Sequence, residues 1–222
     1  MRKRESVAKS LGVLLVAMLA GCSSAQPFVG SRGLPPNVRS RVVALPPANC
    51  PVDHRGSGVL PDGDFSQAPD LGYGFYEPER GQSFAPAWTV AKRTVDFAGS
   101  KYWSLGHFCS VDLDGRNAGG IYSTTFTTKR GKSYQVEFIL SGNGTFDRAD
   151  PSVKTLLLQA ENQIHVFTWN VSGGNDAQHG RYAYQNWTFQ ADRTETTLTF
   201  LSRDHKASTA GPVVADISVT RK

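Results

Sequence analysis

The segment KSYQVEFILSG, residues 132–142, decides the fold class because its side chains alternate in character at every second position. Two sets fall on opposite faces of an extended chain: Tyr134, Val136, Phe138 and Leu140 on one, and Gln135, Glu137 and Ile139 on the other. A period of two is typical of a β-strand with one buried face. The segment therefore predicts such a strand.

Similar alternation recurs on both sides of this segment. It is present in residues 162–170, 195–202 and 212–220, and further strands are predicted at 87–95, 107–113, 121–128, 153–159 and 186–191. In residues 212–220 the pattern predicts that Val213, Ala215, Ile217 and Val219 share a face. No long segment has the helical period of 3.6. About nine or ten strands with little helix favour one all-β domain, an antiparallel β-sandwich or jelly roll.

Residues 1–21 are predicted to be a bacterial lipoprotein signal peptide. Four basic residues precede a short apolar stretch, residues 11–20, which is too short to span a bilayer. Leu19-Ala20-Gly21-Cys22 is similar to a lipobox, which is cut before a cysteine that then carries diacylglycerol and palmitate. The alternative is an ordinary secretory signal with a chance cysteine. No Asp follows Cys22, so the expected location is the bacterial cell envelope, at the outer membrane if the cell has one.

The segment that follows the predicted cleavage site is expected to be a tether. Residues 22–57 are rich in Pro, Ser, Arg and Gly and have no apolar period, which predicts a semi-extended linker and leaves residues 58–222 as the folded domain. The net charge of +5 falls to about +2 without residues 1–21, and no block of Lys and Arg remains. This composition argues against a nucleic-acid partner.

The cysteine count predicts a disulfide. Of three cysteines, Cys50 and Cys109 remain if Cys22 is lipidated. An exported chain meets oxidising conditions, in which an even remainder favours pairing. The bond would pin the end of the tether to the domain. The alternative is two buried free thiols.

The segment SVDLDG, residues 110–115, begins like a calcium loop but does not continue as one. Counted from Asp112, the sixth position of an EF-hand loop is Asn117 in place of Gly, and the twelfth is Ser123 in place of an acid. The sequence instead predicts a strand, a turn at Asp114-Gly115 in which Gly accepts a positive φ, and a second strand.

These residues also carry a family likeness. In order, LPDGDFS (60–66), PAWTVAKRTVDFAGSKYW (86–103), SVDLDG, TTFTTKRGKSYQVEFILSGN (124–143), QNWTFQADRTETTLTFLS (185–202) and GPVVADISV (211–219) resemble the successive motifs of one family. That family comprises the bacterial choice-of-anchor C domains and the related plant cell-wall proteins of domain-of-unknown-function family 642. The resemblance covers about three quarters of the chain, and SVDLDG is its most specific segment.

The resemblance implies a galactose-binding-like β-sandwich, a fold shared with many carbohydrate-binding modules. In related sandwiches an opening acid and a closing Asp can share a structural calcium. Here Ser66 stands where the family usually has Glu, and Val-Ala-Asp216 stands where it has Leu-Asp-Asn. The resemblance therefore leaves Asp62, Asp64 and Asp216 as the candidate calcium ligands, with solvated turn acids and a hydrogen-bonded Asp216 as the alternative.

Motifs of several enzyme classes are absent. The sequence has no Gly-x-Ser-x-Gly elbow, no HExxH and no P-loop, and its five histidines show no metal-ligand spacing. Two acid pairs, Asp147 with Asp150 and Asp192 with Glu195, lie in turn-like stretches, where solvated loop acids are expected in place of facing glycosidase carboxylates. We therefore expect a non-catalytic protein.

The remaining candidates are aromatic side chains in or near predicted loops. Sugars present apolar C–H faces on which such rings stack, and the stretches 71–84 and 173–187 place aromatics beside Asn, Gln, Arg and Asp. The predicted ligand contacts are Tyr73, Tyr76, Trp103, Tyr182 and Tyr184, whereas Trp88, Phe138, Trp187 and Phe200 are predicted to fill the core.

The sequence thus favours a lipid-anchored module outside the cytoplasm that binds carbohydrate or a cell-envelope polysaccharide. One alternative is a structural module that binds an envelope protein. A second alternative is a glycan-active hydrolase.

Overall fold

The computed structural model describes residues 48–52, 58–144 and 150–222. The predicted signal peptide, the lipidation site Cys22 and almost all of the predicted tether lie outside these residues. The described part of the chain contains strands and no α-helix, so it has no helix that is long and apolar enough to cross a membrane.

The strands range from two to ten residues in length. They are β1 (Phe75–Tyr76), β2 (Ser83–Ala85), β3 (Trp88–Lys92), β4 (Asp96–Ala98), β5 (Ser110–Asp112), β6 (Gly120–Ser123), β7 (Phe126–Thr127), β8 (Ser133–Gly142), β9 (Val153–Ala160), β10 (Gln163–Asn170), β11 (Ala183–Gln190), β12 (Glu195–Thr196), β13 (Leu198–Ser202) and β14 (Pro212–Arg221).

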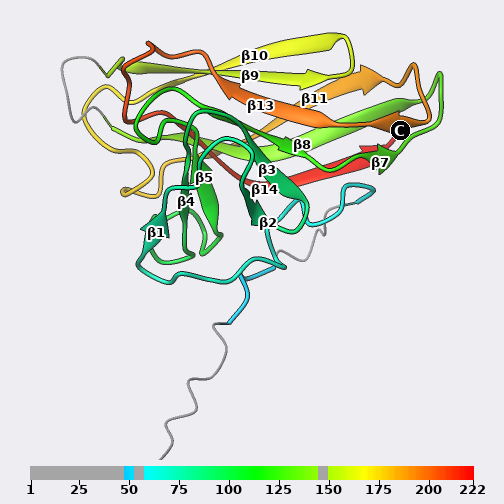
Figure 1. The fold of residues 1–222 in the computed structure, drawn as a ribbon. Coiled ribbons are helices and arrows are strands. Elements are labelled where there is room, and N and C mark those ends of the chain that lie inside the picture. The colour runs from blue at the N-terminus through cyan, green and yellow to red at the C-terminus, as the bar shows by residue number, and fades with distance from the viewer. Residues whose placement is uncertain (1–47, 53–57, 145–149) are drawn as a thin grey trace, which may run out of the picture. The chain divides into compact units, whose positions relative to one another are not determined.

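Two six-stranded antiparallel sheets form the domain. The first sheet has the order β1-β4-β5-β14-β8-β11, and the second has the order β10-β9-β13-β6-β3-β2. Strands β7 and β12 form a small two-stranded sheet. Figure 1 shows β9, β10 and β13 as one layer above β8, β11 and β14. The predicted all-β antiparallel sandwich is therefore confirmed.

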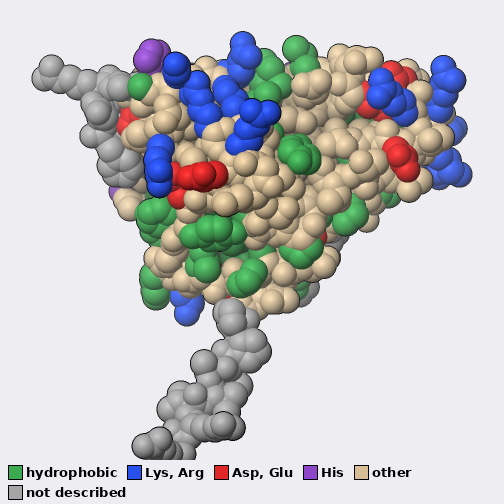
Figure 2. Space-filling view, in the orientation of Figure 1, with side chains coloured by type: hydrophobic (Ala, Val, Ile, Leu, Met, Phe, Trp, Pro, Cys, Tyr) green, Lys and Arg blue, Asp and Glu red, His purple; other side chains and the backbone are tan. Residues whose placement is uncertain are grey.

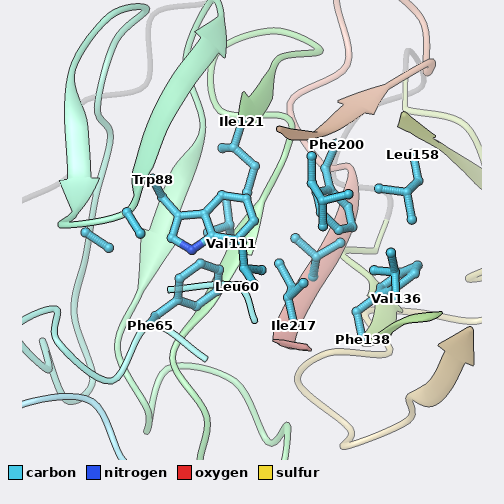
Figure 3. Close-up of a cluster of buried hydrophobic side chains, with 14 of the residues drawn as sticks. Leu60, Phe65, Trp88, Val111, Ile121, Val136, Phe138, Leu158, Phe200 and Ile217 are labelled. Atoms are coloured by element: carbon cyan, nitrogen blue, oxygen red, sulfur yellow. The ribbon is translucent and has the colours of Figure 1, made fainter. Parts of the chain in front are cut away.

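The core lies between the two sheets, where the inward faces of their strands meet. Trp88 and Phe200 of the second sheet have ring centroids 6.0 Å apart, and Phe200 packs edge-on against Phe138 of the first sheet at 5.4 Å. Figure 3 shows these rings pointing into one cluster with Phe65 and Ile217. Trp88, Phe138 and Phe200 are fully buried, as predicted, and Trp187 packs against the cluster while partly buried.

Most predicted strands are present, with two splits and three omissions. The predicted strand 121–128 is divided into β6 and β7, and 195–202 is divided into β12 and β13. Strands β1, β2 and β4 were not predicted, because two or three residues are too few to show a period of two. In β8 the predicted inward face, from Tyr134 to Leu140 at alternate positions, is buried.

The prediction for the last strand is wrong in part. The register of β14 shifts between Ala215 and Ser218, and Asp216 has a positive φ of 47°. Such a bulge adds one residue to the strand. Side chains at alternate positions before and after the bulge therefore point to opposite faces of the sheet. Val214 and Ile217 therefore point into the main core, whereas Val213 belongs to a second cluster.

The SVDLDG segment forms a strand followed by a turn, as predicted, but the turn differs in detail. The Asp112 carboxylate accepts a hydrogen bond from the Asp114 amide at 2.9 Å. Gly115 has no positive φ; instead, a Cβ there would lie 2.6 Å from Oγ1 of Thr94. The glycine is therefore required for close packing.

Candidate functional site

Three of the five predicted aromatic residues surround one hollow of about 650 Å³, which we call the aromatic cleft. Its lining residues are Tyr73, Ser100, Lys101, Trp103, Ser104, Gly106, His107 and Tyr182. Tyr73 is 79% exposed, whereas Trp103 is 5% exposed. Aromatic walls with a few polar groups, in a hollow of this volume, are typical of small-molecule sites.

The other two predicted aromatics do not line the cleft. Tyr184 lies on β11 next to it, with its ring centroid 6.2 Å from that of Tyr182. Tyr76 lies on β1 and packs edge-on against Phe97 of β4 at 5.8 Å. Figure 2 shows hydrophobic side chains gathered where Figure 1 places β1 and β4. Tyr76 therefore covers the side of the core and does not contribute to the cleft.

The first wall of the cleft is the connection from β4 to β5, residues 99–109. A Cβ on Gly99 would lie 2.4 Å from the amide nitrogen of Gly72, so the two backbones meet as only glycine permits. The Lys101 amide donates to the Gly72 carbonyl at 3.0 Å. This close approach brings Tyr73 beside Trp103.

Asp70 and the disulfide hold this wall in place. The Asp70 carboxylate accepts hydrogen bonds from the Ser100 amide at 2.8 Å, the Ser100 hydroxyl at 2.6 Å and the Gly72 amide at 2.9 Å. Although burial opposes it, this set of hydrogen bonds lowers the pKa of Asp70. Cys50 and Cys109 form the predicted disulfide, with Cα atoms 5.8 Å apart.

Cys50, Asp70 and Cys109 are the one group of three or more possible metal ligands in the described chain whose ligand atoms all lie within 4.8 Å of one another. Both sulfurs are joined to each other, so neither can bind a cation as a thiolate. The disulfide is structural.

The second wall is the connection from β10 to β11, residues 171–182. The Ser104 amide donates to the Ala177 carbonyl at 2.9 Å and so joins the two walls. The Trp169 indole donates to the Asp176 carboxylate at 2.8 Å, and Asp176 also forms an ion pair with Arg181. These contacts fix the backbone next to Tyr182.

The base of the cleft is a second hydrophobic cluster on the outer face of the first sheet. Ala98, Trp103, Leu105, Ala177 and Val213 make up its buried part, and Tyr182 packs against it. The Trp103 indole Nε1 is buried and has no hydrogen-bond partner among the described residues. An indole donor in such a position is typically satisfied by an acceptor.

A chain of buried polar side chains connects the second wall to the first sheet. Asp112 is fully buried and accepts a hydrogen bond from Asn143 Nδ2 at 2.6 Å. Asn143 Oδ1 in turn accepts from Asn175 Nδ2 at 2.7 Å. Burial raises the pKa of Asp112 well above its ordinary value. Sequence alone identified Asp112 only as part of a strand, because its partners lie far along the chain.

Three further acids, Asp96, Asp150 and Asp204, are buried or partly buried. Burial, with Glu77 nearby, raises the pKa of Asp96 to about 7. Burial raises the pKa of Asp204 to about 7 despite a hydrogen bond from the Thr155 amide. Asp150, expected to be a solvated loop acid, is 6% exposed and accepts hydrogen bonds from Ser208 and Thr209. These bonds show that Asp150 is a buried, hydrogen-bonded acid and not a solvated one. Its predicted pair partner, Asp147, lies outside the described residues.

The predicted calcium ligands lie where the opening loop meets the bulge in β14. Asp62, Asp64 and Asp216 are each 5% exposed, so they are not solvated turn acids. A Cβ on Gly63 would lie 2.0 Å from the Ile217 carbonyl oxygen, which shows how closely the loop contacts β14. Oδ2 of Asp62 is buried and lacks a hydrogen-bond partner among the described residues.

The fit to a calcium ion is incomplete. In the described chain, these three carboxylates do not bring their oxygens within 4.8 Å of one another. Calcium needs six to eight oxygen ligands at 2.3–2.6 Å. Asp62 offers a free oxygen to a cation, and calcium at this position stays a prediction.

The residues that sequence reasoning missed are the polar ones in the cleft: Ser100, Lys101, Ser104 and His107. Lys101 directly precedes Tyr102 and Trp103 in the sequence, and that adjacency to a predicted ligand contact is the signal that could have identified it. The fold and the site together define an antiparallel β-sandwich whose loops build an aromatic cleft, and this cleft is the candidate ligand site.

The sequence profile of one family, described as a protein of unknown function (DUF642), matches residues 58–220. The chain belongs to this family, as the motifs from LPDGDFS to GPVVADISV indicated. No curated protein sequence matches it.

Similar solved structures include a CBM4 (8% identity, 73% of this chain and 99% of that chain, TM-score 0.42). Another is TmCBM61 in complex with β-1,4-galactotriose (12% identity, 75% and 100%, TM-score 0.40). A third is the family GH115 4-O-methyl-α-glucuronidase BtGH115A (8% identity, TM-score 0.37), where 51% of this chain spans 14% of that chain. At these TM-scores the likenesses say nothing about the ligand of this chain.

Proposed function

We propose that this protein is a lipid-anchored, non-catalytic carbohydrate-binding module of the bacterial cell envelope. The observation that carries the proposal is the convergence of Tyr73, Trp103 and Tyr182 on one cleft of about 650 Å³. Aromatic rings offer flat apolar faces to the C–H groups of a sugar ring, while Ser and Lys side chains bond its hydroxyls.

The construction of the cleft supports binding by a preformed site. Its walls are fixed by the Gly72–Gly99 contact, the Ser104–Ala177 hydrogen bond and the disulfide. A site whose walls are held by the fold loses little conformational entropy when a ligand binds.

Export and lipid anchoring are proposed from the sequence of residues 1–22. The Cys50–Cys109 disulfide supports export, because structural disulfides persist in oxidising compartments outside the cytoplasm. Mass spectrometry of the membrane-extracted protein tests the anchor: Cys22 should be the first residue and should carry acyl chains. An intact N-terminus with an unmodified thiol would contradict this part of the proposal.

The binding function is tested on the chain without residues 1–21 and with Cys22→Ser, by glycan array and affinity electrophoresis. Tyr73→Ala should weaken binding about five- to tenfold with little effect on folding, because Tyr73 is exposed. Tyr122→Ala is the matched control, because Tyr122 is 38% exposed on β6 and does not line the cleft. Hydrolysis of a bound glycan that disappears with one carboxylate substitution would overturn the non-catalytic assignment.

An envelope-protein partner is the second candidate function. Ile164 and Val166 on the edge strand β10 are 59% and 50% exposed. Exposed apolar side chains on a sheet edge favour contact with another protein. Crosslinking in intact cells that depends on Val166, together with the absence of glycan binding, would favour this function.

A further inference from the structure

The polar groups of the aromatic cleft are unevenly divided between donors and acceptors. Lys101 and His107 are the residues of its lining that can carry a positive charge, and none of the lining residues is acidic. A ligand that complements this lining would supply acceptors and negative charge.

Lys101 is held at the cleft by its backbone and by one aromatic contact, and its charge is one of the causes that lower the pKa of the neighbouring Asp70. Its amide is fixed by the Gly72 carbonyl, and its ammonium nitrogen lies 5.7 Å from the ring centroid of Tyr73, in a cation–π contact. Among the described residues it forms no ion pair. The nearby Asp70 carboxylate already accepts three hydrogen bonds from Ser100 and Gly72. Because Lys101 is exposed and forms no ion pair with Asp70, its ammonium can still donate hydrogen bonds to a ligand.

Trp103, at the base of the cleft, carries a second donor, which the protein encloses in this structure. Trp103 is 5% exposed, and its Nε1 is buried without an acceptor among the described residues. A buried unsatisfied donor is unfavourable unless an acceptor reaches it. The Ser100 hydroxyl, in contrast, already donates to Asp70, so it can only accept from a ligand.

From these observations, and on the basis of the proposed function, we propose that the aromatic cleft binds a sugar that bears a carboxylate. The apolar face of the sugar ring lies against Tyr73 and Tyr182, and its carboxylate accepts a hydrogen bond from the Lys101 ammonium. Uronic acids in polysaccharides share this chemistry, as does muramic acid in peptidoglycan strands whose stem peptides have been removed, because its carboxyl group is then free.

The test is isothermal titration calorimetry with matched glycans, which measures their affinities for the Cys22→Ser chain that lacks residues 1–21. The acidic probes are oligomers of galacturonic, glucuronic and mannuronic acid, and a peptidoglycan fragment without stem peptides, whose muramic acid has a free carboxylate. The controls are the same uronic oligomers with methyl-esterified carboxylates, and neutral galactose and glucose oligomers. An acidic oligomer should bind about five- to tenfold more tightly than its ester, and the difference should shrink at high salt.

Variants of Lys101 separate charge from shape. Lys101→Gln should abolish the preference for the acid over the ester, while Lys101→Arg should retain much of it. Lys132→Gln, at an exposed lysine outside the cleft lining, should leave binding unchanged. Binding of esters or neutral oligomers as tight as that of acids, unaffected by Lys101→Gln, would overturn this inference and leave the proposed function standing. Failure of every glycan to bind would overturn both.

Discussion

The Ser104 amide donates a hydrogen bond of 2.9 Å to the Ala177 carbonyl, and this one bond joins two loops that are far apart in the sequence. Ser104 belongs to the connection between β4 and β5, and Ala177 to the connection between β10 and β11. Trp103 precedes Ser104 and packs in one hydrophobic cluster with Ala177, and Tyr182 packs against that cluster. The shape of the cleft therefore depends on how the loops are fixed.

Loss of the disulfide should destabilise the domain and weaken ligand binding. Cys50 and Cys109 are 59 residues apart, so their bond restricts the unfolded chain, and its removal should lower the free energy of unfolding by about 2–4 kcal/mol. Urea denaturation of Cys50→Ser/Cys109→Ser measures the change. Cys22→Ser alone is the control and should unfold like the parent; equal stability of all three proteins would contradict a structural role for the bond.

Asn143→Ala should destabilise the fold and loosen the second wall of the cleft. The substitution removes the Asn143 amide group, which donates a hydrogen bond of 2.6 Å to Oδ2 of Asp112. It also removes the Asn143 oxygen that accepts a hydrogen bond from Asn175. Loss of a donor to a buried carboxyl group should cost about 1–3 kcal/mol. Thermal unfolding measures this loss, and amide hydrogen exchange should show faster exchange in residues 171–182. Asn186→Ala, at an exposed position on β11, should change neither; similar unfolding of both variants would argue against the network.

Stability should decrease as the pH rises from 5 to 8. The pKa of Asp96 and that of Asp204 are each raised to about 7 in the folded chain, from 3.8. The folded state therefore binds more protons than the unfolded state in this range, so the stabilisation is complete below about pH 4 and is lost as the pH passes 7. With these pKa values, the melting temperature should be higher at pH 5 than at pH 8 by roughly 10 °C.

Asp96→Asn isolates one part of this pH dependence. The amide cannot ionise, so the variant should melt at a higher temperature than the parent at pH 8 and show a shallower pH slope. Glu77, Arg116 and Asp114 surround Asp96 and keep their own charges in the variant. Asp192→Asn, in an exposed loop, should retain the parental slope. A parent protein that is more stable at pH 8 than at pH 5 would contradict the raised pKa values.

Calcium should stabilise the domain if the opening loop binds it. A cation would give the buried Oδ2 of Asp62 the partner that it lacks among the described residues. Differential scanning fluorimetry in CaCl₂ and in EDTA measures the shift in melting temperature, which Asp62→Asn should abolish. Magnesium chloride at the same concentration is the control for ionic strength. Identical melting curves in calcium and EDTA would leave Asp62, Asp64 and Asp216 as hydrogen-bonding groups of the loop.

The sequence by itself determined the fold class and the disulfide. Alternation along 132–142 identified β8 and its buried face, because successive side chains of any strand point to opposite sides. The same rule failed to predict the buried face of β14, because the bulge at Asp216 shifts the alternation by one residue. The sequence pattern of this strand does not reveal the bulge. The prediction of a cysteine pair followed from an even count of two in a chain that is predicted to be exported.

Only the tertiary structure decided which aromatic residues meet. Tyr73 and Tyr76 are three residues apart in similar surroundings, yet Tyr73 lines the cleft and Tyr76 packs on Phe97. The cleft forms because loops that follow β4 and β10 converge on one face of the first sheet, and that convergence depends on strand order. Periodicity is a local property of the chain, whereas strand order depends on contacts between distant residues, so no local pattern contained the site.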